Sequence, residues 1–92
     1  MPLQHVAGTK KADIKIYALS TCPWCRKAKQ FLDQHGEDYN FTDVDLLTGD
    51  ERHQAMAVVK KWNPSASFPT IVIDDSRCIV GFREDELKEL VK

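Results

Sequence analysis

The sequence has little of several features that would point at once to a function. Its 92 residues include three cysteines and carry a formal net charge of −1. Three cysteines are too few, and odd in number, for a framework of disulfides. The near-neutral charge gives no reason to expect nucleic acid or an anionic membrane as a partner. No run of about 18 apolar residues is present, so we expect no transmembrane helix.

Missing motifs exclude further classes. The segment 1–11 lacks the apolar core of about seven residues that a signal peptide requires, so we expect a cytoplasmic protein with reduced thiols. No Gly-x-Gly-x-x-Gly is present, and we therefore expect no direct use of NADPH. The cysteines and histidines lack the paired spacing of a structural zinc site, and we expect no metal site.

What remains is the composition of an ordinary soluble domain, with 42% hydrophobic and 29% charged residues. Residues 1–12 show no periodicity, and we predict a flexible N-terminal arm there. Residues 13–92 are then enough for one domain with a modest core. We expect this domain to be a monomer without a permanently bound cofactor.

Hydrophobic periodicity predicts an α/β domain, in which short apolar runs alternate with segments of helical spacing. The predicted elements are, in order, a strand over 13–19, a helix over 23–35, a strand over 39–45, a helix that starts with a capping box at 48–51, strands over 71–73 and 77–80, and a helix from about 84. The first helix, between two strands, predicts parallel pairing through a right-handed crossover. The order β-α-β-α-β-β-α thus predicts a four-stranded mixed sheet flanked by three helices.

The stretch with the clearest chemistry is Ser-Thr-Cys-Pro-Trp-Cys at residues 20–25. Two cysteines separated by two residues at a strand-to-helix junction predict a dithiol/disulfide site. Cys22 falls at the helix start, where unpaired N–H groups and the helix dipole favour a thiolate, and Pro23 suits the first helical position. Cys25 lies one turn further on, close enough to form a disulfide with Cys22. Cys78, within a predicted strand, is expected to be a small buried residue.

Cys22-Pro23-Trp24-Cys25 resembles the active site of glutaredoxins, which usually reads Cys-Pro-Tyr-Cys. The element order over residues 13–92 resembles their thioredoxin fold. The resemblance implies a thiol–disulfide oxidoreductase in which Cys22 attacks a substrate disulfide and Cys25 resolves the mixed disulfide. Its substrates would be protein disulfides or mixed disulfides of glutathione. Trp24 would form an aromatic rim beside Cys22, and Thr21 would donate a hydrogen bond near the Cys22 sulfur.

Phe68-Pro69-Thr70 is a second stretch that resembles this family. In thioredoxin-like proteins a cis-proline lies opposite the cysteine pair, and Pro69 stands at the matching place after the second predicted helix. A cis bond there would leave the backbone of Phe68 free to pair with an extended, disulfide-bearing peptide. The resemblance implies that Phe68 and Thr70 contact the substrate or glutathione.

Gly81-Phe82-Arg83 departs from the two glycines usual in glutaredoxins. It resembles NrdH-redoxins, whose pattern is Gly-Phe-Arg-Pro-Asp and which are reduced by thioredoxin reductase. Gly81 and Phe82 would then lie at the glutathione cleft, with Phe82 filling part of it, while Arg83 or Asp85 would bind a charged group of glutathione. The resemblance leaves open a glutathione-dependent reductase, an NrdH-like redoxin and an iron–sulfur cluster carrier. A binding module without redox chemistry is disfavoured by the intact cysteine pair.

Overall fold

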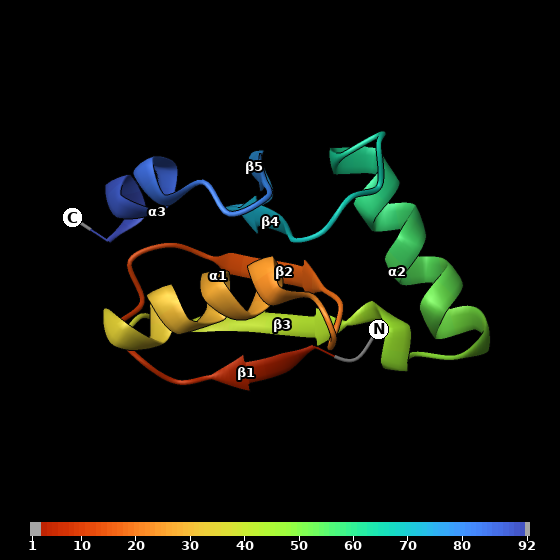
Figure 1. Cartoon of the computed structure of the whole chain (residues 1–92), viewed down its shortest axis with the longest axis horizontal. Coiled ribbons are helices and arrows are strands. Elements are labelled where there is room, and N and C mark those ends of the chain that lie inside the picture. The colour runs from red at the N-terminus through yellow and green to blue at the C-terminus, as the bar shows by residue number, and fades with distance from the viewer. Residues whose placement is uncertain (1–2, 92) are drawn as a thin grey trace.

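The computed structural model describes residues 3–91 and shows a five-stranded sheet with helices on both faces (Figure 1). The elements are, in order, β1 (Gln4–Val6), β2 (Ile14–Ala18), α1 (Pro23–Gln34), β3 (Tyr39–Asp43), the 3-10 helix η1 (Val44–Leu46), α2 (Gly49–Trp62), β4 (Thr70–Ile73), β5 (Arg77–Val80) and α3 (Glu84–Leu90). The predicted α/β class with three α-helices is confirmed. No helix in the described part of the chain is long and apolar enough to cross a membrane.

The strand β2 lies at the centre of the sheet, whose order is β1-β3-β2-β4-β5. It pairs in parallel with β3 and antiparallel with β4, and β5 extends β4 as a hairpin. The parallel pair is joined through α1, as the crossover rule requires. Because β2 is covered on both faces, four of its five residues are buried. The cysteine motif follows directly at its carboxyl end.

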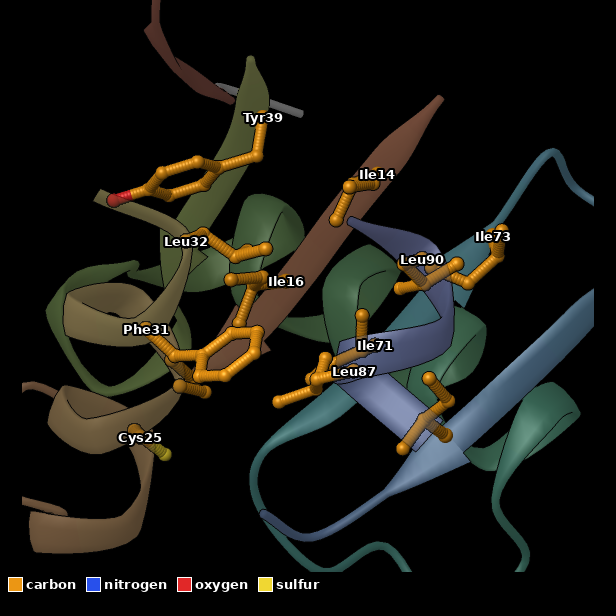
Figure 2. Close-up of a cluster of buried hydrophobic side chains, with 13 residues drawn as sticks. Ile14, Ile16, Cys25, Phe31, Leu32, Tyr39, Ile71, Ile73, Leu87 and Leu90 are labelled. Atoms are coloured by element: carbon orange, nitrogen blue, oxygen red, sulfur yellow. The ribbon is translucent and has the colours of Figure 1, made fainter. Parts of the chain in front are cut away.

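One face of the sheet packs against α1 and α3 (Figure 2). Ile16 of β2 and Ile71 of β4 point toward Leu32 of α1 and Leu87 of α3, and all four side chains are fully buried. The same cluster includes Cys25, which has no exposed surface. The second cysteine of the motif is therefore anchored in the hydrophobic core.

The opposite face of the sheet packs against α2. Tyr17, one residue along β2 from the first cluster, lies with Ala55 and Val59 of α2 in a second buried cluster, as the alternation of side chains along a strand dictates. The helix begins after Thr48, whose side chain makes no capping hydrogen bond. The predicted capping box is therefore not formed.

The edge strand β1 shows that the prediction of a four-stranded sheet is wrong. It comes from the segment predicted to be an arm and pairs antiparallel with β3. After it, the N–H of Thr9 donates to the carbonyl of Gly36 at 2.7 Å, and Thr9 accepts from the N–H of Asp38 at 3.0 Å. The strand was missed because it uses backbone hydrogen bonds and keeps its side chains mostly exposed. The first two residues of the predicted arm lie outside the described residues.

Candidate active site

The cysteine motif lies where β2 ends and α1 begins. Cys22 is the N-cap residue of α1, with an extended backbone, and Pro23 occupies the first turn. The Cys22 sulfur accepts a hydrogen bond from the backbone N–H of Cys25 at 3.4 Å, which satisfies one of the N–H groups left unpaired at a helix start. The hydrogen bond expected from Thr21 to this sulfur is not formed in the part of the chain that the structure describes.

The thiols of the motif differ in exposure. Cys22 is partly exposed and Cys25 is fully buried, and neither is in a disulfide. Burial raises the pKa of the Cys25 thiol from 9.0 to about 12, with a further contribution from its hydrogen bond with Cys22. Cys78 is also partly buried, and its thiol donates to the carbonyl of Trp62 at 3.1 Å. Only Cys22 of the motif is therefore accessible to a disulfide from outside.

We expect an alkylating reagent to modify Cys22 much faster than Cys25 in the folded, reduced protein at mildly alkaline pH. The reagent reacts with thiolates, whereas Cys25 is buried and stays protonated up to its raised pKa of about 12. Peptide mass spectrometry after a brief reaction measures both sites. The urea-unfolded protein is the control, in which both cysteines react. Equal modification of the two in the folded protein would contradict this geometry.

Asp45 holds the loop that precedes the motif. Its carboxylate accepts hydrogen bonds from the backbone N–H of Ser20 at 2.8 Å and from the Ser20 hydroxyl at 2.5 Å. The N–H of Cys22 in turn donates to the carbonyl of Leu19 at 3.2 Å. Neither Ser20 nor Asp45 was predicted as a site residue, because they are 25 positions apart and only the pairing of β2 with β3 brings them together.

We expect the contribution of Asp45 to stability to be sensitive to acid. Its hydrogen bonds with Ser20 hold the pKa of this carboxyl below its ordinary value of 3.8. The stabilisation is therefore complete well above pH 3.8 and is lost as the pH falls through the lower pKa of the folded state. Urea denaturation at several pH values should show wild type more stable than Asp45→Asn at neutral pH and the two converging in acid. A constant difference would contradict this expectation.

The loop before β4 contains the cis peptide bond Phe68–Pro69, the geometry that the family resemblance implies. Thr70 is fully buried, and its hydroxyl donates to the carbonyl of Ser67 at 2.8 Å and accepts from the Asn63 amide at 3.2 Å. Asn63 also donates to the Ser67 carbonyl at 3.1 Å. Asn63, for which no role was predicted, thus holds the loop before Pro69. Phe68, which is partly exposed, and not Thr70, reaches the surface.

Three aromatic rings form a continuous set near the motif. The Trp24 side chain is 55% exposed, and its ring stacks on Phe82 with 6.3 Å between centroids. Phe82 meets Phe31 edge-on at 6.4 Å. Cys22, Phe68 and Phe82 pack against the same core cluster. The fold therefore gathers the predicted site residues of α1, of the loop before β4 and of the loop before α3.

The segment between β5 and α3 joins this site through its backbone. Gly81 has a φ of +82°, which glycine adopts without strain, and its N–H donates to the carbonyl of Pro69 at 2.9 Å. Arg83 is the N-cap residue of α3 and lies 3.5 Å from the carboxylate of Glu86. Asp85 is exposed in the first turn of α3. Both predicted charged residues are therefore at the surface.

This arrangement is that of the thioredoxin-like proteins, in which a βαβ half carries the cysteine pair and a ββα half carries the cis-proline. The chain belongs to the glutaredoxin family, since the family model for glutaredoxin matches residues 14–78. The matched stretch includes both cysteines of the motif and the cis-proline. The family predicted from the sequence is therefore confirmed.

Known relatives extend the similarity over most of the chain. An uncharacterized glutaredoxin-like 8.6 kDa protein in the rubredoxin operon of Clostridium pasteurianum is 35% identical over 79 residues, which cover 86% of this chain and 97% of the relative. The glutaredoxin of Methanosarcina mazei Go1 has a TM-score of 0.89 and 43% identity, covering 97% of this chain and 86% of that one. The methanoredoxin of Methanosarcina acetivorans has a TM-score of 0.88 and 42% identity, covering 91% and 88%.

Proposed function

We propose that this protein is a thiol–disulfide oxidoreductase that reduces protein disulfides or glutathione mixed disulfides by a dithiol mechanism. The observation that carries the proposal is the placement of the two thiols. Cys22 is accessible at the N-cap of α1, and Cys25 is buried one turn further on, with its N–H bonded to the Cys22 sulfur. The Cys22 thiol is thus accessible to the substrate, while the Cys25 thiol lies buried next to it.

The proposed reaction has two exchange steps. The Cys22 thiolate attacks one sulfur of the substrate disulfide, forming a mixed disulfide and expelling the other sulfur as a thiolate. Cys25 then gives up its proton and attacks the Cys22 sulfur, which forms the Cys22–Cys25 disulfide and releases the second substrate sulfur. Two electrons pass from the cysteine pair to the substrate, which leaves as two thiols after taking up two protons.

The raised pKa of Cys25 explains why Cys22 reacts first and Cys25 second in the proposed reaction. Besides burial, the hydrogen bond and the charge of Cys22 both raise the pKa of Cys25. Once Cys22 is bound in a mixed disulfide, its negative charge is gone, and the pKa of Cys25 falls. Cys25 therefore gains nucleophilicity at the step that needs it, and it stays protonated before that step.

Two electron donors are consistent with the family, and the position of Phe82 favours a thioredoxin reductase over glutathione. The Phe82 ring stacks on Trp24 beside the motif and occupies surface where the resemblance implies part of a glutathione cleft. Arg83 and Asp85 remain exposed next to it and are the proposed contacts for glutathione, if glutathione is the donor. We propose the NrdH-like route as the second candidate function.

We expect Phe82→Gly to raise glutathione-dependent turnover, because it opens this surface and restores the paired glycines usual in the family. The protein is supplied with NADPH and a small disulfide, once with glutathione and glutathione reductase and once with thioredoxin reductase, and NADPH consumption is followed. If wild type turns over with the glutathione system and not with thioredoxin reductase, the protein is a glutathione-dependent reductase. Turnover with thioredoxin reductase and not with the glutathione system supports the NrdH-like route. Activity with neither donor contradicts both.

We further propose a cytoplasmic monomer without a permanently bound cofactor and with no nucleic-acid or membrane partner. The near-neutral charge supports the absence of a nucleic-acid or anionic-membrane partner, and the small, odd number of cysteines supports a reducing compartment. Within residues 3–91, no group of three or more His, Cys, Asp or Glu side chains is placed to hold a metal ion. An iron–sulfur cluster would therefore need ligands from outside this chain. Visible absorbance after anaerobic purification tests the cluster-carrier alternative.

A further inference from the structure

A shallow hollow lies between α1 and α3, next to the aromatic rings of the candidate site. Its volume is about 190 Å³, and the residues that line it are Lys27, Gln30, Phe31, Gln34, Phe82 and Glu84. Sites for small molecules usually measure roughly 300–1,000 Å³, so this α1/α3 hollow suits a single large side chain better than a whole ligand. Phe82 also stacks on Trp24, which connects the hollow to the cysteine motif.

The lining of the α1/α3 hollow combines an apolar floor with polar amides. Phe31, which is 7% exposed, and the partly exposed Phe82 supply aromatic surface. Gln30 and Gln34 are exposed and lie one turn apart on α1. In the part of the chain that the structure describes, neither amide has a hydrogen-bond partner. Such amides offer both donors and acceptors to a passing peptide backbone.

Charge is distributed unevenly along this hollow. Lys27 lines the hollow at its end nearest the cysteine motif, and Arg26 precedes it on α1. Both are exposed, and neither forms an ion pair within residues 3–91. The Lys27 ammonium lies 4.5 Å from the centre of the Trp24 ring. Glu84, on the side of α3, is already paired with Lys88 at 3.5 Å. The end near Cys22 is therefore the end that attracts an acidic group.

We propose that the α1/α3 hollow docks an extended segment of the protein substrate, with a large apolar residue in the hollow and an acidic residue between it and the reactive cysteine. The inference rests on the proposed reductase function and specifies its substrate class. Gln30 lies about 12 Å along the helix from Cys22 at the usual rise per residue. An extended peptide covers that distance in about four residues. The acidic residue then lies near Arg26 and Lys27.

Synthetic peptides test this arrangement. Each peptide carries one cysteine joined by a disulfide to mercaptoethanol. An aspartate stands two residues from this cysteine and a phenylalanine four residues from it. In one peptide both lie on the amino side of the cysteine, and in a second peptide both lie on its carboxyl side. Comparison peptides have serine in place of phenylalanine or lysine in place of aspartate. For one of the two directions, we expect the reduced wild-type protein to react about fivefold faster with the phenylalanine peptide than with the matching serine peptide, as partial burial of a large apolar group implies.

Two matched variants locate the effect. Gln30→Phe fills the α1/α3 hollow, whereas Gln54→Phe makes the same change at an exposed position of α2. For each protein, the rate with the phenylalanine peptide is divided by the rate with bis(2-hydroxyethyl) disulfide, and circular dichroism checks the fold. We expect Gln30→Phe to lose the preference for phenylalanine and Gln54→Phe to keep it.

The outcomes separate this inference from the function on which it rests. Equal rates for all peptides with wild type, together with normal reduction of the small disulfide, overturn the docking site and leave the reductase intact. A preference that survives in Gln30→Phe overturns the location. Failure to reduce any disulfide overturns both. If Gln30→Phe does not fold, the peptide series with wild type still decides whether the apolar and acidic residues are recognised.

Discussion

Replacing Cys22 by serine is expected to lower disulfide reduction to below about 1% of wild type, because a serine hydroxyl is not ionised at neutral pH and cannot replace the thiolate nucleophile. The measurement is the coupled consumption of NADPH with a small disulfide substrate. Cys78→Ser is the matched control, since Cys78 lies on β5 with its thiol bonded to the Trp62 carbonyl. It is expected to keep near-normal activity. Appreciable turnover by Cys22→Ser contradicts the dithiol mechanism.

Cys25→Ser extends this prediction to the second step. With Cys22 intact and the resolving thiol removed, the first exchange still occurs and the mixed disulfide accumulates. Intact-protein mass spectrometry after incubation with oxidised glutathione should then show one added glutathione, which wild type loses through Cys25. An adduct located on Cys78 would contradict the assignment of Cys22 as nucleophile.

Leu32→Ala is expected to lower the free energy of unfolding by about 3 kcal/mol, because it combines lost apolar burial with a cavity under α1. Leu32 has no exposed surface and lies in the cluster that joins α1 and α3 to the sheet (Figure 2). Leu46→Ala is the matched control, since Leu46 is 65% exposed and surface changes of this kind usually cost less than about 0.5 kcal/mol. Urea denaturation measures both. Equal losses would contradict the assigned core.

The cysteine pair and Leu32 belong to neighbouring parts of one structural unit. Leu32 and Cys25 belong to the same buried cluster, and Cys25 connects that cluster to the sulfur of Cys22 through its N–H. The core thus fixes the position of the start of α1 relative to the end of β2. A loss of packing under α1 that leaves the fold intact is therefore expected to act on reactivity through the position of Cys25.

In the proposed docking arrangement, the hollow between α1 and α3 makes substrate selection a property separate from the chemistry. The cysteine pair depends on a helix start and on burial, whereas the polar residues that line the hollow, Lys27, Gln30, Gln34 and Glu84, are exposed on α1 and at the start of α3. Changes in that lining are expected to alter which disulfides are reduced without altering how a disulfide is reduced. Gln30→Phe and Cys22→Ser are accordingly expected to have different signatures, a change in preference and a loss of turnover.

The sequence by itself determined the features that depend on neighbouring residues. The spacing of apolar residues marked the three helices and the strands of the central sheet, and the cysteine pair marked a helix start. Cys22 is found at the N-cap and Pro23 in the first turn, because capping and proline geometry act within one turn. The cis bond before Pro69 was predicted from the family resemblance, since the intrinsic preference of an X-Pro bond is trans.

Only the tertiary structure decided the features that join distant segments. The strand β1 forms through backbone hydrogen bonds to β3, which leave no mark in side-chain periodicity. Asp45 reaches Ser20, and Phe82 stacks on Trp24, because β2, β3 and the loop before α3 converge at one edge of the sheet. Thr21, which the sequence placed near the sulfur, is replaced there by the N–H of Cys25, since the helix supplies its own unpaired donors at that end.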